Sequence, residues 1–133
     1  MAEPRFVLDH AGVEVSDFAV SRAFYERALE PLGFTVQMDF GEQFKALGMG
    51  LPGKPSFWIR QAAERPSGPL HLAFHATDRE RVNRFHEAAL AAGGTDNGPP
   101  GLREHYHPNY YGAFVLDPDG NNVEAVCHLA ADA

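Results

Sequence analysis

The stretch that decides the fold is His10–Gly33, which reads HAGVEVSDFAVSRAFYERALEPLG and recurs without a gap at His71–Gly94 as HLAFHATDRERVNRFHEAALAAGG. Unrelated segments agree at only about 5% of positions, so this density of matches indicates a duplicated supersecondary unit. A duplicated unit that carries a duplicated histidine suggests a pseudo-symmetric site between the two copies. The identical pairs are His10/His71, Asp17/Asp78, Phe24/Phe85, Glu26/Glu87, Ala28/Ala89, Leu29/Leu90 and Gly33/Gly94.

The first copy predicts a module over residues 6–61 with the order β-α-β-β-β. Asp17 suits a helix N-cap, and Gly33 ends the apolar pattern of helical spacing that follows it. Short β-branched and apolar runs, separated by glycine and proline, predict the strands. The expected strands are 6–15, 34–40, 43–47 and 56–60.

The second copy predicts a module over residues 69–129, so that one domain spans residues 1–133. Asp78 is the expected N-cap, and the helix ends at Gly93-Gly94. The proline-rich stretch 97–108 is expected to be an irregular loop. The turn sequence DPDG at 117–120 predicts a hairpin. The expected strands are 70–77, 110–116 and 122–129.

Composition excludes several classes of function. The chain is 44% hydrophobic and 22% charged, as in ordinary globular proteins, and its net charge of −7 argues against nucleic acid or an anionic membrane as partner. It has no apolar run of about 20 residues and no signal-peptide pattern. A single cysteine, Cys127, suits a reducing compartment. We therefore expect a cytoplasmic protein that acts on a small molecule.

Three side chains form the strongest chemical constellation. His10 and His71 occupy equivalent strands, and Glu124 interrupts an otherwise apolar last strand. A carboxylate inside a sheet is costly unless it is paired or binds a cation. Two imidazoles and a carboxylate suit a divalent first-row metal with open positions. The alternative is a solvent-facing Glu124 and two strand-end histidines with ordinary hydrogen bonds.

The chain resembles the vicinal oxygen chelate superfamily, which includes glyoxalase I, extradiol dioxygenases, fosfomycin-resistance transferases and bleomycin-binding proteins. The segments that carry the resemblance are LDHAGVEVSD, FYERALEPLGF, HLAFHATD and AFVLDPDGNNVEAV. The resemblance implies an α+β fold in which two tandem βαβββ modules form a curved mixed sheet cup with the helices outside. It also implies that His10, His71 and Glu124 bind a divalent metal ion (Zn, Ni, Mn or Fe).

One feature departs from glyoxalase I, which has a fourth ligand on the last strand of its first module. Aligning the two modules places Trp58 opposite Glu124, and neighbouring Arg60 stays protonated and cannot replace a ligand. Three ligands with an open face are more similar to the fosfomycin-resistance or dioxygenase arrangement. Trp58 then suits a core position or a wall of the cup.

Further residues are candidates for substrate binding. His75 alternates with His71 and so shares its face. The loop 103–111 collects aromatic and histidine side chains that suit a lid or a substrate wall, or a solvated loop anchored by a tyrosine. The candidate substrate-binding residues are Trp58, His75, His107 and Tyr111.

The resemblance implies a glyoxalase-like lyase or isomerase, in which Glu124 is a metal ligand and, on transient release, the catalytic base. The alternatives are a non-enzymatic binding protein for a drug or antibiotic, and an Fe(II) dioxygenase. In short two-module relatives, module one of one chain pairs with module two of another. We therefore expect a homodimer with His10 meeting His71 and Glu124 across the interface.

Overall fold

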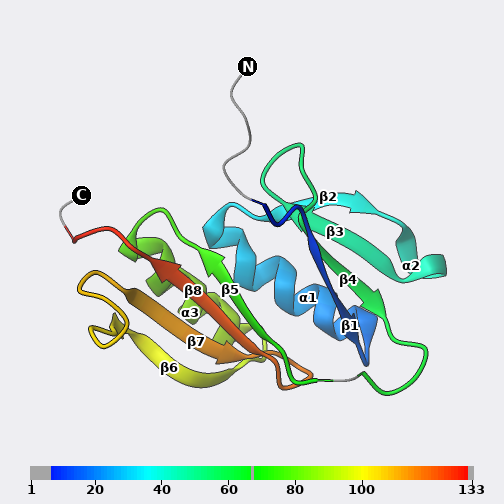
Figure 1. Cartoon of the computed structure of the whole chain (residues 1–133). Helices are drawn as coiled ribbons and strands as arrows, with labels where there is room; N and C mark the ends of the chain where they lie inside the picture. The colour runs from blue at the N-terminus through cyan, green and yellow to red at the C-terminus, as the bar shows by residue number, and fades with distance from the viewer. Residues whose placement is uncertain (1–6, 67, 132–133) are drawn as a thin grey trace.

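The computed structural model describes residues 7–66 and 68–131, which form two four-stranded mixed sheets and the helices that cover them (Figure 1). The first sheet has the order β1-β4-β3-β2 and the second the order β5-β8-β7-β6. The elements of module one are β1 (Ala11–Val15), α1 (Phe18–Leu29), the 3₁₀ turn η1 (Glu30–Leu32), β2 (Thr35–Asp39), α2 (Gly41–Phe44), β3 (Ala46–Gly50) and β4 (Phe57–Gln61). Those of module two are β5 (His71–His75), α3 (Arg79–Ala91), β6 (Thr95–Leu102), β7 (Tyr111–Leu116) and β8 (Asn122–Cys127).

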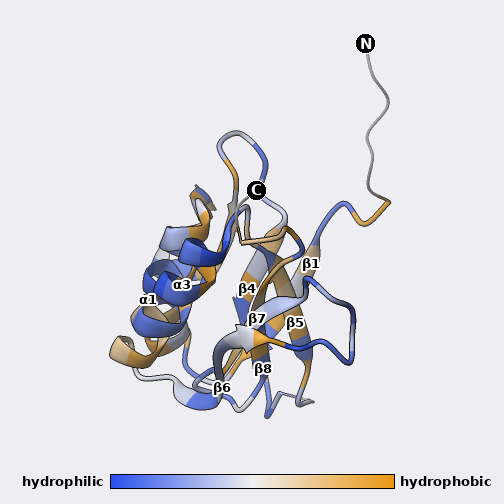
Figure 2. Ribbon diagram, turned by 90° about the vertical axis from the view of Figure 1, so that its left-hand side faces the viewer, coloured by the Kyte–Doolittle hydropathy of each residue, from blue (hydrophilic) through white to orange (hydrophobic). Residues whose placement is uncertain are grey.

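This arrangement confirms the expected α+β fold of two βαβββ modules. Figure 2 shows α1 and α3 together on one side of the sheets, with their hydrophilic faces outward. Among the described residues, no helix has the length and apolar character that crossing a bilayer requires.

The hydrophobic core lies between the helices and one face of each sheet. Alternate residues of each strand point to it, as the period-two pattern requires: Val13 and Val15 of β1 are buried, as are Val123 and Ala125 of β8. The opposite face of each strand is therefore free for polar side chains. Both helices begin at the expected aspartates, because the Asp17 side chain accepts from Val20 N at 3.2 Å and that of Asp78 from Arg81 N at 2.8 Å.

Two expected segments change type in the structure. The strand expected at 6–15 is also shorter, since β1 begins at Ala11 and residue 6 lies outside the described residues. The strand expected at 43–47 begins at Ala46, because residues Gly41–Phe44 form the short helix α2. Asp39 Oδ1 accepts from Gly41 N at 2.8 Å, which favours this turn, and Lys45 ends it in the left-handed region with φ 47°.

The expected irregular loop at 97–108 is the second correction, since Thr95–Leu102 is strand β6 and pairs with β7. The pairing shifts register on both sides of Gly98. Pro99 and Pro100 have no backbone N–H to donate. They are tolerated in β6 because it is an edge strand, so that no further strand pairs with its outer side.

A buried polar cluster around Asp117 ties the modules together. Asp117 is 5% exposed and accepts from Asp119 N at 2.9 Å, Asn121 N at 2.8 Å and Asn121 Nδ2 at 2.9 Å. The Tyr25 hydroxyl of α1 also donates to it. Burial, and then the Asp117 charge, raise the pKa of Tyr25 well above its usual value. This donor set fixes the DPDG turn against the helix of the other module.

We expect Asp117→Ala to lower the free energy of unfolding by about 3 kcal/mol, because leaving buried donors unsatisfied costs roughly 1–3 kcal/mol each. Chemical denaturation measures the change. Asp119→Ala is the matched control in the same turn, since its hydrogen bonds to Ser16 are exposed, and it should cost about 1 kcal/mol or less. Equal losses in the two variants would contradict a structural role for the buried cluster.

Candidate metal and substrate site

The site is built around Glu124, a carboxylate that is 1% exposed in the middle of β8. Its two oxygens have separate partners. His71 Nε2 lies 2.8 Å from Oε1, and the Tyr110 hydroxyl donates to Oε2. Both partners are needed, because a buried carboxylate without them would lose its hydration uncompensated.

Strand register explains why these side chains meet. β5 runs parallel to β8 with Ala73 opposite Glu124, and β7 runs antiparallel with Phe114 opposite Glu124. Directly paired residues share a face, and alternation puts His71 on the same face as Ala73. The His71 side chain is 56% exposed, so the pair opens to solvent on the histidine side.

Tyr110 is a site residue that sequence reasoning missed. It precedes β7, and the rule of alternation gives it the face of Gly112 and Phe114, which is the Glu124 face. The spacing of two residues from Tyr110 to Gly112 and of four to Phe114 was therefore the sequence feature that could have identified Tyr110 as a site residue. Burial, and then the hydrogen bond to Glu124, raise the pKa of Tyr110 well above its usual value, so the phenol is a neutral donor at physiological pH.

Tyr111 takes the opposite direction. Its hydroxyl donates to Asn83 Oδ1 at 2.6 Å, and the Arg79 guanidinium lies 5.0 Å from its ring centroid, so the side chain faces α3. We therefore propose Tyr110, in place of Tyr111, as the tyrosine that lines the pocket.

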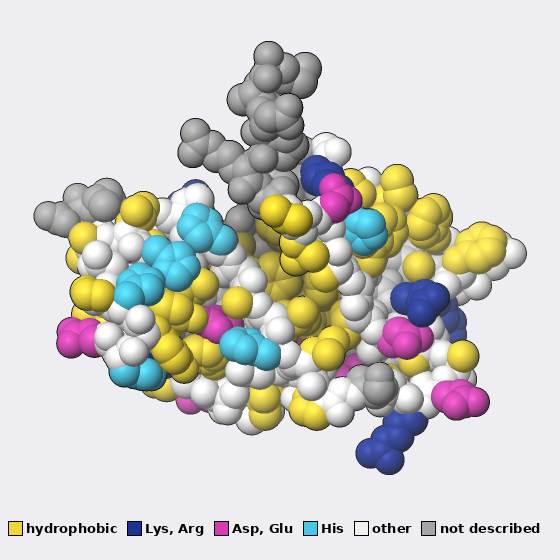
Figure 3. All heavy atoms as spheres, viewed as in Figure 1, with side chains coloured by type: hydrophobic (Ala, Val, Ile, Leu, Met, Phe, Trp, Pro, Cys, Tyr) yellow, Lys and Arg dark blue, Asp and Glu magenta, His cyan; other side chains and the backbone are white. Residues whose placement is uncertain are grey.

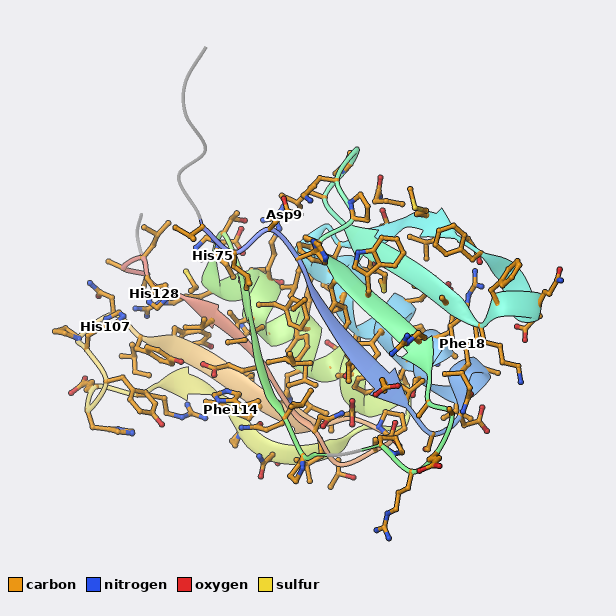
Figure 4. The ribbon with its side chains drawn as sticks, turned by 45° about the vertical axis from the view of Figure 1, so that its right-hand side comes forward. Asp9, Phe18, His75, His107, Phe114 and His128 are labelled. Atoms are coloured by element: carbon orange, nitrogen blue, oxygen red, sulfur yellow. The ribbon has the colours of Figure 1, made fainter. Side chains whose placement is uncertain are left out.

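His75 and His107 lie together with a third histidine, His128 (Figure 4). His107 Nε2 is 2.7 Å from His128 Nδ1, and the His75 and His128 rings are nearly parallel with centroids 6.2 Å apart. Partial burial, and then the nearby His107 and His75, lower the pKa of His128, while Glu124 opposes this. Figure 3 shows histidine side chains gathering over the half of the molecule that module two builds.

Trp58 and His10 lie on module one. The Trp58 ring stacks on Phe40 with centroids 5.9 Å apart and planes at 14°, and a side chain on Gly48 would meet the indole at 3.0 Å. A cavity of about 520 Å³ beside it is lined by His10, Gly12, Val13, Glu14, Ala46, Trp58, Ile59 and Arg60. The stacked Trp58–Phe40 pair beside this cavity offers a surface that suits an apolar or planar group.

The register also confirms that Trp58 occupies the place in module one that Glu124 has in module two. Gly12 pairs with Trp58 as Ala73 pairs with Glu124, and Gly12 and Ala73 are sixty-one positions apart, the offset of the repeat. Module one thus presents an aromatic ring where module two presents a carboxylate.

His10 does not join His71 and Glu124 within the chain. Its Nδ1 lies 2.8 Å from Asp9 Oδ2, and its side chain is 59% exposed. β1 and β5 run in opposite directions in Figure 1, so that His10, just before β1, and His71, at the start of β5, lie at opposite ends of the two strands. In the part of the chain that the structure describes, no three His, Cys, Asp or Glu side chains are placed to hold a metal ion.

A larger cavity, about 780 Å³, lies away from this chemistry. It is lined by residues around the linker and the β7–β8 turn, among them Ser16, Arg65 and Asp119. Among the described residues no histidine lines it, and neither does Glu124, so this cavity is separate from the donor groups of the site.

The donor pair fits half of a metal site. Two ligand atoms about 2.1 Å from one ion lie roughly 3.0 Å apart at a 90° octahedral angle and roughly 3.4 Å apart at a tetrahedral angle. His71 Nε2 and Glu124 Oε1, at 2.8 Å, therefore need to separate only by a few tenths of an ångström. Imidazole and carboxylate together suit a first-row divalent ion. His10 would supply a third donor only from a second copy of the chain.

The profile of the Glyoxalase/Bleomycin resistance protein/Dioxygenase superfamily matches residues 7–125 of this chain. The chain belongs to this superfamily. No curated protein matches it. The membership confirms the resemblance drawn from the repeated segments and the DPDG hairpin.

Solved structures of the superfamily share this fold. A glyoxalase/bleomycin resistance protein from Albidiferax ferrireducens T118 is 29% identical, with a TM-score of 0.75 over 91% of this chain and 98% of that chain. A glyoxalase/bleomycin resistance protein/dioxygenase family enzyme from Burkholderia phytofirmans PsJN is 22% identical, with a TM-score of 0.70 over 92% of this chain and 98% of that chain. The second likeness supports the fold alone.

Proposed function

We propose that this chain is a metal-dependent enzyme of the glyoxalase type, which acts on a small molecule with two adjacent oxygens. The observation that carries the proposal is Glu124, a fully buried carboxylate whose Oε1 faces the exposed imidazole of His71 at 2.8 Å. A bound divalent ion would polarise the substrate oxygens and stabilise negative charge that develops on them.

The residues of the chain take separate roles in this proposal. His71 and Glu124 would hold the ion, and Glu124 would take a proton from the substrate as general base. His75 and His107 line the polar side of the pocket, while Trp58 covers the apolar side and excludes water. Supporting this division, the histidines gather on module two and the Trp58–Phe40 pair lies on module one.

The complete site requires a homodimer in this proposal. Because His10 and His71 lie at opposite ends of β1 and β5, one chain does not bring them together. β1 and β5 are each paired on one side only in the described sheets, which leaves edges suited to pairing with another chain. Module one of one copy would then face module two of the other, in two sites per dimer.

The buried free cysteine Cys127 supports a cytoplasmic location.

A second candidate function is a binding protein without catalysis. The Trp58–Phe40 pair and the 520 Å³ cavity beside it favour it, since such a wall holds a planar ligand without an ion. Fe(II) dioxygenase chemistry is the third alternative, and dependence of turnover on oxygen separates it from the first.

Metal content tests the proposal most directly. Protein purified without chelators should contain close to one divalent ion per chain by elemental analysis, and titration of metal-free protein with Zn²⁺, Ni²⁺, Mn²⁺ or Fe²⁺ should reach the same stoichiometry. Binding of aromatic ligands by protein that takes up no ion would overturn the enzyme proposal and favour the binding protein.

A further inference from the structure

Tyr110 contacts the one oxygen of Glu124 that His71 leaves free. Its hydroxyl donates to Oε2, while His71 Nε2 faces Oε1. The two partners come from different elements, the loop before β7 and strand β5. The carboxylate is therefore held at both ends, and its rotation about the last side-chain bond would break one of the contacts.

The fold leaves room for this contact at Gly112. A Cβ at Gly112 would lie 3.3 Å from Tyr110 Cε1 and 3.5 Å from Glu124 Oε2, against both members of the pair. A larger side chain on this face of β7 would push the phenol and the carboxylate apart.

The phenol itself is held by its loop. The Tyr110 ring meets His107 edge-on at 5.3 Å and His128 at 5.5 Å, and these two histidines are joined by the 2.7 Å contact of their ring nitrogens. Backbone bonds fix the loop at its base, since Arg103 N donates to Tyr110 O at 2.7 Å and Tyr110 N to His107 O at 3.1 Å. The hydroxyl therefore has a set direction before any ligand binds.

We propose that Tyr110 is the positioning residue of Glu124: its hydroxyl holds Oε2, so that Oε1 alone is presented beside His71 to an incoming ion. The part of this inference that concerns the ion rests on the proposed function. The positioning of Glu124 by Tyr110 rests on the phenol–carboxylate contact alone. Side chains that orient a metal-binding carboxylate typically contribute 10–100-fold in affinity.

The test compares Tyr110→Phe with Tyr111→Phe, the matched control, because Tyr111 loses its bond to Asn83 on the α3 side and does not touch Glu124. Calorimetric titration with Co²⁺ should show affinity about 10–100-fold weaker for Tyr110→Phe and little changed for Tyr111→Phe. The visible spectrum of the Co²⁺ protein should also weaken in Tyr110→Phe, since a released Oε2 joins the ion and raises its coordination number. A merely structural role would not change the spectrum in that way.

Nuclear magnetic resonance of the Tyr110 hydroxyl proton tests the contact without an ion. A phenol proton held by a carboxylate exchanges slowly with water and resonates downfield, so the wild type should show this signal at neutral pH, Tyr110→Phe should lack it and Glu124→Gln should shift it upfield. A hydroxyl signal unaffected by Glu124→Gln, or equal Co²⁺ affinity and spectrum in Tyr110→Phe and wild type, overturns the inference. A wild-type chain that takes no Co²⁺ overturns the proposed function and the ion part of the inference, while the hydroxyl signal still decides whether Tyr110 holds Glu124.

Discussion

Glu124→Gln should abolish metal binding and any turnover while leaving the chain folded. The amide keeps the shape of the buried side chain but loses the charge that holds a cation and the basicity that moves a proton. Loss of an orienting partner alone typically costs 10–100-fold in metal affinity, so loss of the ligand itself should cost at least about 100-fold.

Folding should survive because the amide can still serve both neighbours. Its oxygen accepts from the Tyr110 hydroxyl and its amino group faces His71, so that neither partner loses its contact. We expect thermal unfolding of the variant to stay cooperative and close to that of the wild type. Glu80→Gln on the exposed face of α3 is the matched control, since its pairing with Arg84 at 3.2 Å is far from the site, and it should bind metal normally.

The activity measurement uses methylglyoxal with glutathione as the first substrate pair, followed as thioester formation with added Ni²⁺, Zn²⁺, Mn²⁺ or Fe²⁺. Wild-type turnover should stop on chelation and return with metal. Turnover that survives both the chelator and Glu124→Gln would contradict metal-assisted catalysis at this site. No turnover with this pair would reject only the glyoxalase reaction, and metal binding would remain to be judged by elemental analysis.

Much of the fold was predictable because it depends on local patterns that occur twice. The repeated strand, aspartate cap and helix gave both βαβββ modules, and the polar interruption of an apolar strand indicated that Glu124 is special. Strand β6 was not predictable by composition, because its prolines disfavour a strand in general. They are tolerated only at a sheet edge, and sheet order is a long-range property.

The candidate site was predictable in part for the same reason. His71 and Glu124 meet through the pairing of β5 with β8, which the family resemblance implied. Tyr110 and Tyr111 are adjacent, so their side chains point to opposite faces of the sheet. Which of them faces Glu124 and which faces α3 depends on the register of β7 against β8. An error of one residue in a strand exchanges the two faces, and the sequence does not define strand ends that closely.

A mixture of His10→Ala and Glu124→Gln chains should recover a metal site that neither variant forms alone. If the site is shared between copies, each homodimer has two damaged sites. A mixed dimer instead combines the intact His10 of the Glu124→Gln chain with the intact His71 and Glu124 of the His10→Ala chain, and so has one complete site and one doubly damaged site. One ion per mixed dimer is the expected stoichiometry, against two for the wild type.

The experiment requires exchange of subunits, which co-expression of differently tagged chains and purification through both tags achieves. Metal content and any turnover per mixed dimer should reach about half of the wild-type values, as one intact site in two implies. The matched control mixes His71→Ala with Glu124→Gln chains. Both residues belong to module two and meet at 2.8 Å within one chain, so that every site in this mixed dimer is damaged and none recovers.

The outcomes separate the two arrangements of the modules. Recovery in the first mixture but not in the control places His10 of one chain beside His71 and Glu124 of the other, as the opposite directions of β1 and β5 lead us to expect. Loss of metal in every mixture, or a stable monomer by light scattering with metal binding intact, would contradict the shared site. A monomer that still binds metal would use His71 and Glu124 without His10, and His10→Ala would then bind metal as tightly as the wild type.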